Sequence, residues 1–212
     1  TSAMRTRRFT DCRTVLIVVR HGRTEANASG LLLGRRLDPG LDDVGQRQAA
    51  ALGRVLAAAD RVVASPMRRA RETAAAIGRP VEIDERWIEI DYGSFDGTPL
   101  ADVPAATWQA WRSDPEFTLG EDAESLAAVA ARVRSAADDL VEEARTRTVV
   151  VVTHVSPIKA VTAWALGVPD DTVWRMYCAP ASITEIATAG PTPTLRSYNV
   201  TAHVDGTWEM RG

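Results

Sequence analysis

The run Thr14-Val-Leu-Ile-Val-Val19 is continuous, apolar and mostly β-branched, and Arg20-His21-Gly22 follows it directly. Such a run is typical of a strand that is buried on both faces of a parallel sheet. Residues 148–153 form a second run of this kind, and residues 61–65 form a shorter third one. We therefore predict a parallel sheet whose first strand ends at two polar side chains.

Helical patterns lie between these strands, over residues 43–59, 67–77 and 124–145. Strands that alternate with helices predict an α/β fold, here a three-layer α/β/α sandwich with a mostly parallel central sheet. The length of 212 residues fits one domain. We place that single domain at residues 14–212 and interpret residues 1–13 as an N-terminal extension or a tag remnant.

Two junctions in the chain share one pattern. A strand leads through Ser65-Pro66 into a helix, and another strand leads through Ser156-Pro157 into a helix. Serine at the N-cap with proline at the first helical position is a strong helix-start signal. We expect both helices to begin just beyond the carboxyl end of a strand, at the edge of the sheet where α/β proteins bind ligands.

The segment from residue 92 to 121 combines several prolines with large aromatic side chains. It predicts an irregular excursion with a short helix over residues 105–112. Such a segment either lines a pocket or forms a small satellite core. Residues 182–186 and 195–200 are two further strand candidates. Four tryptophans elsewhere are expected to pack in the core or at an interface: Trp87, Trp164, Trp174 and Trp208.

The overall charge argues against large anionic partners. The formal net charge is −3 and the pI is about 5.7, so no global field attracts nucleic acid or an anionic membrane. No apolar run reaches the roughly 18 residues of a membrane span, and the first residues lack the apolar stretch of a signal peptide. We expect a cytoplasmic protein without membrane or nucleic-acid partners, and leave its oligomeric state open, a homo-oligomer included.

Polar side chains follow three of the predicted strands. Arg20 and His21 end the first strand, and Thr24 and Asn27 follow with groups that can donate hydrogen bonds into the same space. A lone histidine beside an arginine is more often an incidental surface pair than a site.

Two further residues change this balance. Arg69 falls in the first turn of the helix after the second strand, where an anion also meets free backbone N–H groups. His154 falls at the end of the third strand, so two of the three histidines stand at strand ends. Their convergence at one edge of the sheet predicts an anion-binding site.

With these residues in place, the sequence closely resembles the histidine phosphatase superfamily, in its phosphoglycerate mutase-like branch and its small phosphatase type. The resemblance rests on five motifs in the expected order: Arg20–Asn27, Ser65–Ala74, Ile88–Gly97, Ala123–Leu126 and Val152–His154. It implies the phosphoglycerate mutase-like fold.

The resemblance also implies roles for the motif residues. His21 would accept the phosphoryl group, and Glu89 would be the proton donor. Arg20, Arg69 and His154 would bind the group in transfer. Arginine forks and a protonated imidazole can stabilise the charge of a moving phosphoryl group, so neither a metal nor another cofactor is expected. The implied enzyme is a metal-independent phosphoric monoester hydrolase that acts on small-molecule phosphate esters through a phosphohistidine on His21.

The chain departs from the family pattern at two positions near this site. Val155 stands where glycine usually follows the second histidine, and Arg23 stands where glutamate or glutamine is frequent. We count both with Thr24 and Asn27 as phosphate- or substrate-binding candidates, with the shape of the substrate site in question. Arg35 and Arg36 could bind a second anionic group, although a solvated arginine face is the more ordinary interpretation.

Two alternatives stay open at this point. One is a phosphoglycerate mutase on the same scaffold, although the chain shows no insertion that would enclose a phosphorylated enzyme. The other is a catalytically weak relative that binds phosphorylated ligands. His203, in the tail, is interpreted as structural, and the physiological substrate cannot be read from the sequence.

Overall fold

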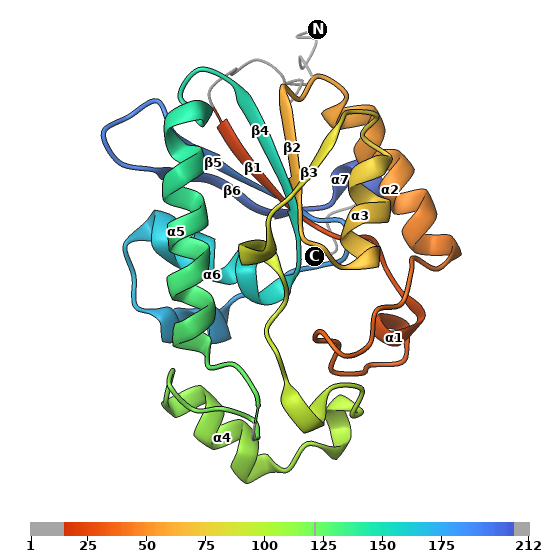
Figure 1. Cartoon of the computed structure of the whole chain (residues 1–212), viewed down its shortest axis with the longest axis vertical. Helices are drawn as coiled ribbons and strands as arrows, with labels where there is room; N and C mark the ends of the chain where they lie inside the picture. Colours follow the sequence, from red (N-terminus) through yellow and green to blue (C-terminus); the bar gives the residue numbers. More distant parts are fainter. Residues whose placement is uncertain (1–14, 121, 206–212) are drawn as a thin grey trace, which may run out of the picture.

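The computed structural model describes residues 15–120 and 122–205, and these residues build one six-stranded sheet (Figure 1). The strand order is β3-β2-β4-β1-β5-β6. The first four strands in this order are parallel, and the last two are antiparallel to their neighbours. The strands are β1 (Val15–Arg20), β2 (Arg61–Ala64), β3 (Val81–Ile83), β4 (Thr148–Thr153), β5 (Ile183–Ala187) and β6 (Thr194–Val200). The expected extension at residues 1–13 and Trp208 lie outside the described residues.

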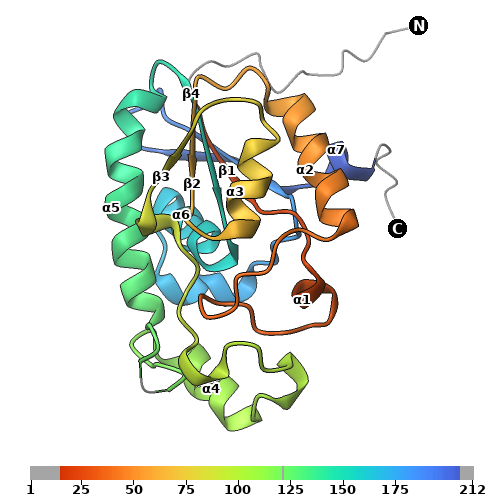
Figure 2. The same ribbon diagram turned by 45° about the vertical axis from the view of Figure 1, so that its right-hand side comes forward.

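Helices cover both faces of the sheet, which confirms the three-layer α/β/α sandwich (Figures 1 and 2). One face packs against α2 (Asp43–Leu56), α3 (Arg68–Ala75) and α7 (Ala202–Asp205). The other packs against α5 (Leu126–Ala144) and α6 (Val155–Leu166). Two more helices, α1 (Glu25–Ala28) and α4 (Ala105–Ser113), lie beyond one end of the sheet. The described residues also form four short 3-10 segments: Glu85–Trp87, Gly93–Phe95, Leu100–Asp102 and Asp170–Arg175.

The alternation of side chains along β1 explains this layering. Leu16 and Val18 belong to the core beneath α5 and α6, whereas Val15, Ile17 and Val19 belong to the core beneath α2 and α3. Because both faces are covered, the strand is apolar at every position, as the sequence indicated. No helix within the described part of the chain is long and apolar enough to cross a lipid bilayer.

The serine-proline prediction is right about the location of the helices and wrong about their caps. Helix α3 begins at Arg68 and helix α6 begins at Val155, so neither serine is an N-cap. The first N–H groups of these helices bind carboxylates from other segments instead. Arg68 donates to Asp38, and Val155 donates to Glu89. A tertiary partner has replaced the local cap.

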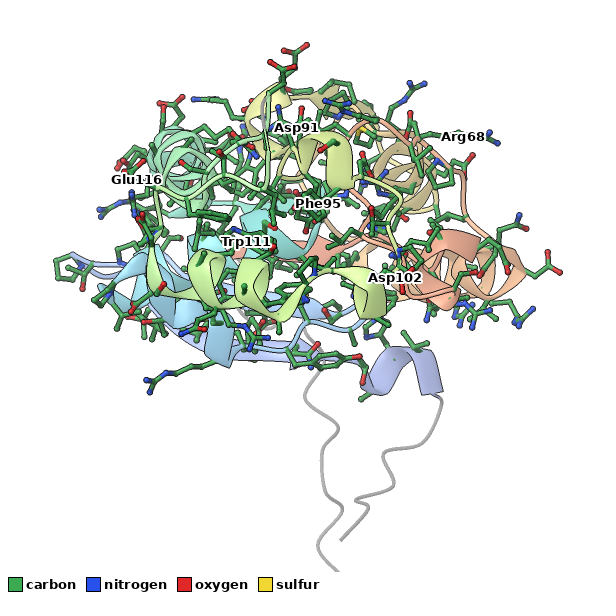
Figure 3. All side chains as sticks on the ribbon, turned by 90° about the horizontal axis from the view of Figure 1, so that it is seen from below. Arg68, Asp91, Phe95, Asp102, Trp111 and Glu116 are labelled. Carbon is green, nitrogen blue, oxygen red and sulfur yellow. The ribbon has the colours of Figure 1, made fainter. Side chains whose placement is uncertain are left out.

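The aromatic excursion forms a cap over one end of the sheet (Figure 3). It has both of the predicted roles, a pocket lining and a small satellite core. Trp111 is buried, with its ring edge-on to Tyr92 at 5.6 Å between centroids and stacked on Trp108 at 5.4 Å. Trp108 and Trp111 also line a pocket. The excursion is therefore a small aromatic core whose inner surface is a pocket wall.

Two glycines let the turn after β1 pack directly on α2. A Cβ on Gly22 would lie 2.6 Å from the carbonyl oxygen of Gly45, and a Cβ on Gly45 would lie 2.0 Å from that of Arg23. These obstacles are backbone atoms that cannot rotate away. The close approach holds the segment that follows His21 in place.

Gly45→Ala should therefore destabilise the protein. We expect the free energy of unfolding to fall by about 1–3 kcal/mol, because the added methyl group overpacks a backbone contact. Urea denaturation with an unchanged m-value measures the effect. Gly190→Ala is the matched control, because its new methyl group would meet only ordinary contacts at 3.5 Å. The control should stay within about 0.5 kcal/mol of the parent, and equal losses in both variants would contradict the interpretation.

Candidate active site

Parallel pairing brings the predicted polar residues to one edge of the sheet. Arg20 is in register with Thr153, and the backbone N–H of His21 donates to the Thr153 carbonyl at 2.9 Å. His21 and His154 therefore leave adjacent strands at the same level. Their ring centroids lie 5.0 Å apart.

The hydrogen bonding of His21 determines which ring nitrogen can react. Nδ1 lies 2.7 Å from the carbonyl oxygen of Gly22, which can only accept, so Nδ1 carries the proton. Burial, with the nearby charges of Arg69 and Arg20, lowers the pKa of His21 well below its usual value. The ring is consequently neutral at pH 7, with an unprotonated Nε2.

His154 is also neutral in this structure. It is fully buried, and burial, followed by the charge of Arg69, lowers its pKa well below the usual value. Its Nε2 lies 2.7 Å from the hydroxyl oxygen of Ser65, which directly follows β2. Ser65 is therefore a residue of the site that the sequence did not predict. Burial and the charges of Arg69 and Arg20 thus disfavour a positive charge on His154, whereas the sequence led us to expect a protonated imidazole around the phosphoryl group.

The two arginines are held by backbone carbonyl oxygens. Arg69 is 0% exposed and donates to Gly34 at 2.8 Å and to Leu37 at 3.3 Å. Arg20 donates to the carbonyl of Cys178 at 2.6 Å. These neutral acceptors fix the guanidinium groups, and Arg69 also has a longer ion pair, 3.8 Å to the carboxylate of Asp38.

Three buried nitrogens of this cluster have no hydrogen-bond partner among the described residues: Nε of Arg20, Nε of Arg69 and Nδ1 of His154. An unsatisfied buried donor typically costs about 1–3 kcal/mol. The two arginine N–H groups are unpaired donors on cations, and Nδ1 of His154 is a third donor in the tautomer whose Nε2 accepts from Ser65. Together these groups complement an anion with several oxygens.

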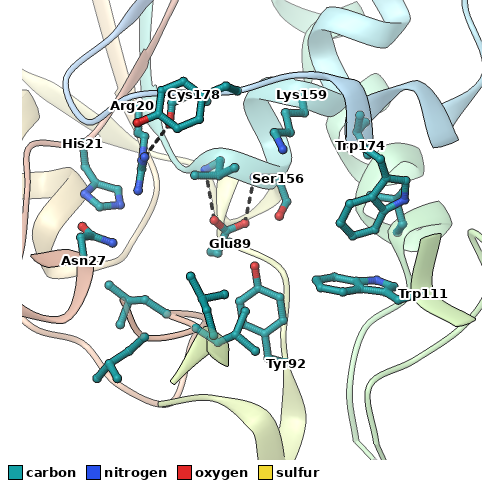
Figure 4. Close-up of a pocket in the computed structure, with 18 of the residues that line it drawn as sticks. Arg20, His21, Asn27, Glu89, Tyr92, Trp111, Ser156, Lys159, Trp174 and Cys178 are labelled. Atoms are coloured by element: carbon teal, nitrogen blue, oxygen red, sulfur yellow. Dashed lines mark hydrogen bonds between the residues drawn. The ribbon is translucent and has the colours of Figure 1, made fainter. Parts of the chain in front are cut away.

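Glu89 lies at the N-terminus of α6 and is 3% exposed. Its carboxylate accepts hydrogen bonds from the backbone N–H groups of Ile90 at 2.9 Å, Val155 at 3.1 Å and Ser156 at 3.1 Å (Figure 4). The acid is thereby fixed at the pocket wall opposite His21.

A pair of arginines supports Glu89 from behind. Arg35 donates to its backbone carbonyl at 2.6 Å and Arg132 at 3.4 Å, and both also bind the carboxylate of Glu124. The sequence suggested that Arg35 binds a second anionic group or belongs to a solvated arginine face. The structure shows neither role, because Arg35 binds the Glu89 carbonyl and the Glu124 carboxylate. The motif that contains Glu124 serves to orient Glu89.

The four peripheral candidates separate into two pairs. Asn27 and Val155 line the pocket next to His21. Thr24 instead caps helix α1 through Asn27, and Arg23 pairs with Asp42 at 2.8 Å with its side chain 38% exposed. The structure does not bring Arg23 or Thr24 into the pocket.

The pocket has a volume of about 320 Å³ and two chemically different ends (Figure 4). Arg20, His21 and Glu89 form the polar end, and aromatic and aliphatic side chains, with tryptophan and leucine the commonest, form most of the rest. Trp174, expected only to pack, is one of these wall residues, and Lys159 also lines the pocket. Lys159 could have been found from the sequence, because it follows Val155 by four residues and so lies on the same helix face.

Comparisons with known proteins place this geometry in a family. The family model of the histidine phosphatase superfamily, branch 1, matches residues 16–201. Phosphoserine phosphatase 1 of Hydrogenobacter thermophilus is 31% identical over 198 residues, which cover 89% of this chain and 93% of that protein. Glucosyl-3-phosphoglycerate phosphatase of Mycolicibacterium vanbaalenii is 35% identical over 193 residues, which cover 84% of each.

A solved structure agrees with these relatives. Phosphoserine phosphatase of Entamoeba histolytica, in complex with 3-phosphoglyceric acid, has a TM-score of 0.82 at 25% identity and matches 90% of this chain and 98% of that one. The chain therefore belongs to the histidine phosphatase superfamily, branch 1, and its enzyme class is that of the phosphoric monoester hydrolases.

Proposed function

We propose that this protein hydrolyses small-molecule phosphate monoesters in two steps, through a phosphohistidine on His21 and without a metal ion. The observation that carries the proposal is the unprotonated Nε2 of His21 in a cluster where the buried Nε–H groups of Arg20 and Arg69 lack partners among the described residues. A nucleophile and donors for the phosphoryl oxygens lie together there, as phosphoryl transfer requires.

In the first step, Nε2 of His21 attacks phosphorus and forms a P–N bond while the bond to the ester oxygen breaks. Arg20, Arg69 and His154 stabilise the charge that spreads over the other phosphoryl oxygens. Glu89 gives a proton to the departing ester oxygen, so the product leaves as an alcohol.

In the second step, water attacks the phosphorus of the phosphohistidine. Glu89 now takes a proton from that water, the P–N bond breaks, and inorganic phosphate forms. His21 returns to its starting tautomer because the Gly22 carbonyl keeps the proton on Nδ1. One carboxyl group thus serves as acid and then as base.

The names of the relatives support small substrates. Phosphoserine and glucosyl-3-phosphoglycerate name the two related phosphatases, and the solved structure holds 3-phosphoglyceric acid. Each of these compounds combines a phosphate ester with a carboxylate. Small phosphate esters of this kind are the first substrates to examine, and the volume of about 320 Å³ suits them.

His21→Ala should abolish the release of phosphate from p-nitrophenyl phosphate and from phosphoserine, because it removes the nucleophile. The parent protein should keep its activity in EDTA and yield an acid-labile phosphoprotein when quenched during turnover.

His203→Ala is the matched histidine control, since His203 binds a backbone carbonyl at Ala181 outside the pocket. It should retain turnover. Loss of activity in EDTA, or an active His21→Ala variant, would contradict the mechanism. Conversion of 3-phosphoglycerate to its isomer without free phosphate would favour a mutase instead.

Glu89→Gln should distinguish substrates by their leaving groups. We expect kcat for phosphoserine to fall by about 10²- to 10⁴-fold, because its alkoxide needs a proton to leave. The loss for p-nitrophenyl phosphate should be much smaller, since its phenolate leaves readily. Steady-state kinetics on both esters measure the difference, and equal losses would show that Glu89 does not act as the acid.

Histidine NMR in phosphate-free buffer should find His21 and His154 neutral from pH 7.5 down to pH 5.5, since burial and two arginines lower both pKa values. The ring of His21 should carry its proton on Nδ1. Chain unfolded in urea is the control and should titrate near pH 6.5. The unfolded chain then binds more protons, so the free energy of unfolding should fall as the pH drops below about 6.5. Histidines that titrate near pH 6.5 in the folded protein would contradict the proposed nucleophile.

A further inference from the structure

Lys159 is unusual in this chain. Of the 25 lysine and arginine residues, it is the single lysine. It lies on α6, one turn beyond Val155, and it is half-buried. Its side chain points from the helix into the pocket (Figure 4). All the remaining residues of these two types are arginine, so lysine occurs only at this position of the pocket wall.

The ammonium group of Lys159 makes no hydrogen bond or ion pair with the residues that the structure describes. Its electrostatic neighbours are Cys178, Glu89 and Arg20, and burial lowers its pKa. A partly desolvated cation without a fixed partner is available to a ligand. The arginines near the pocket differ from Lys159, because Arg20 binds a backbone carbonyl and Arg35 binds the Glu124 carboxylate.

The pocket walls beyond Lys159, on the side away from His21, are aromatic (Figure 4). Trp111 meets Trp174 edge-on with 4.7 Å between ring centroids and stacks on Trp108. Outside this group, Arg112 lies over the rings of Trp108 and Trp174, at 5.5 and 6.0 Å. The tryptophans therefore hold one another in place and offer a firm apolar surface.

From this arrangement we infer that, if the protein is the phosphatase proposed above, Lys159 binds a carboxylate on the alcohol part of the substrate. The body of that alcohol is apolar or aromatic and lies against Trp108, Trp111 and Trp174. The substrate thus reaches from the phosphoryl site at His21 to a second, singly charged anchor on α6.

The charges favour a carboxylate over a second phosphate. Lys159 supplies one positive charge at this end of the pocket. A dianionic phosphate would exceed the charge of a single ammonium, whereas a carboxylate forms a balanced pair with Lys159. Lysine presents a compact charge on a flexible stem, which suits a single contact in a narrow space.

Lys159→Met tests this inference with two matched substrates, phenyl phosphate and 3-carboxyphenyl phosphate. We expect the ratio of kcat/KM for the carboxylated ester to that for phenyl phosphate to fall by about 10- to 100-fold. Arg147→Met is the control, because it removes an exposed cation paired with Glu143 outside the pocket lining and should leave the ratio unchanged. Trp174→Ala should lower kcat/KM more for 3-carboxyphenyl phosphate than for phosphoserine.

Equal losses on both aryl esters in Lys159→Met, or a pH profile displaced equally for both, would overturn the inference. Lys159 would then act on Glu89 and not on the substrate. Equal losses on 3-carboxyphenyl phosphate and phosphoserine in Trp174→Ala would overturn the inference that an apolar substrate body lies against the tryptophans. No phosphate release by the parent from any ester is a different result, because it contradicts the proposed function itself.

The single lysine also allows a binding test without turnover. Reductive methylation with ¹³C-formaldehyde labels Lys159 and the chain's amino terminus, and the lysine signal is the one absent from Lys159→Met. In the His21→Ala background, 3-carboxyphenyl phosphate should shift that signal and phenyl phosphate should shift it far less. Equal shifts, or no shift with either ester, would overturn the inference.

Discussion

The parallel pairing of β1 with β4 is the constraint on which the site depends. Both strands are buried on both faces, and their register places His21 beside His154 at a single edge. A slip of one residue would turn apolar side chains toward the wrong core and move the two rings apart. Chemistry and folding therefore rely on the same backbone hydrogen bonds.

The site is positive although the protein is not. Its net charge is −3, yet Arg20 and Arg69 meet at His21 with only neutral carbonyl groups as close hydrogen-bond partners. Burial, together with this local field, lowers the pKa of His21 and keeps a nucleophilic nitrogen free. Asp38 pairs with Arg69 only at 3.8 Å, and Glu89 is held by backbone N–H groups of α6.

The departure at Val155 has a simple physical account. The contact that matters at this position is its backbone N–H, which donates to Glu89, and any residue except proline supplies that donor. The side chain is left to line the pocket. At the other departure, the charge of Arg23 is paired with the carboxylate of Asp42, the N-cap residue of α2. Both changes leave the central cluster intact.

The sequence by itself determined the sheet, the order of its main helices and the residues at the strand ends, because apolar runs and helical periodicity are local signals. It missed β3, a three-residue edge strand with little apolar pattern. Only the tertiary structure decided that Glu89 replaces a helix cap, that Arg35 supports Glu89, and that Lys159 faces aromatic walls. Those contacts join segments far apart in the chain, and no local pattern records which distant partner satisfies a buried polar group.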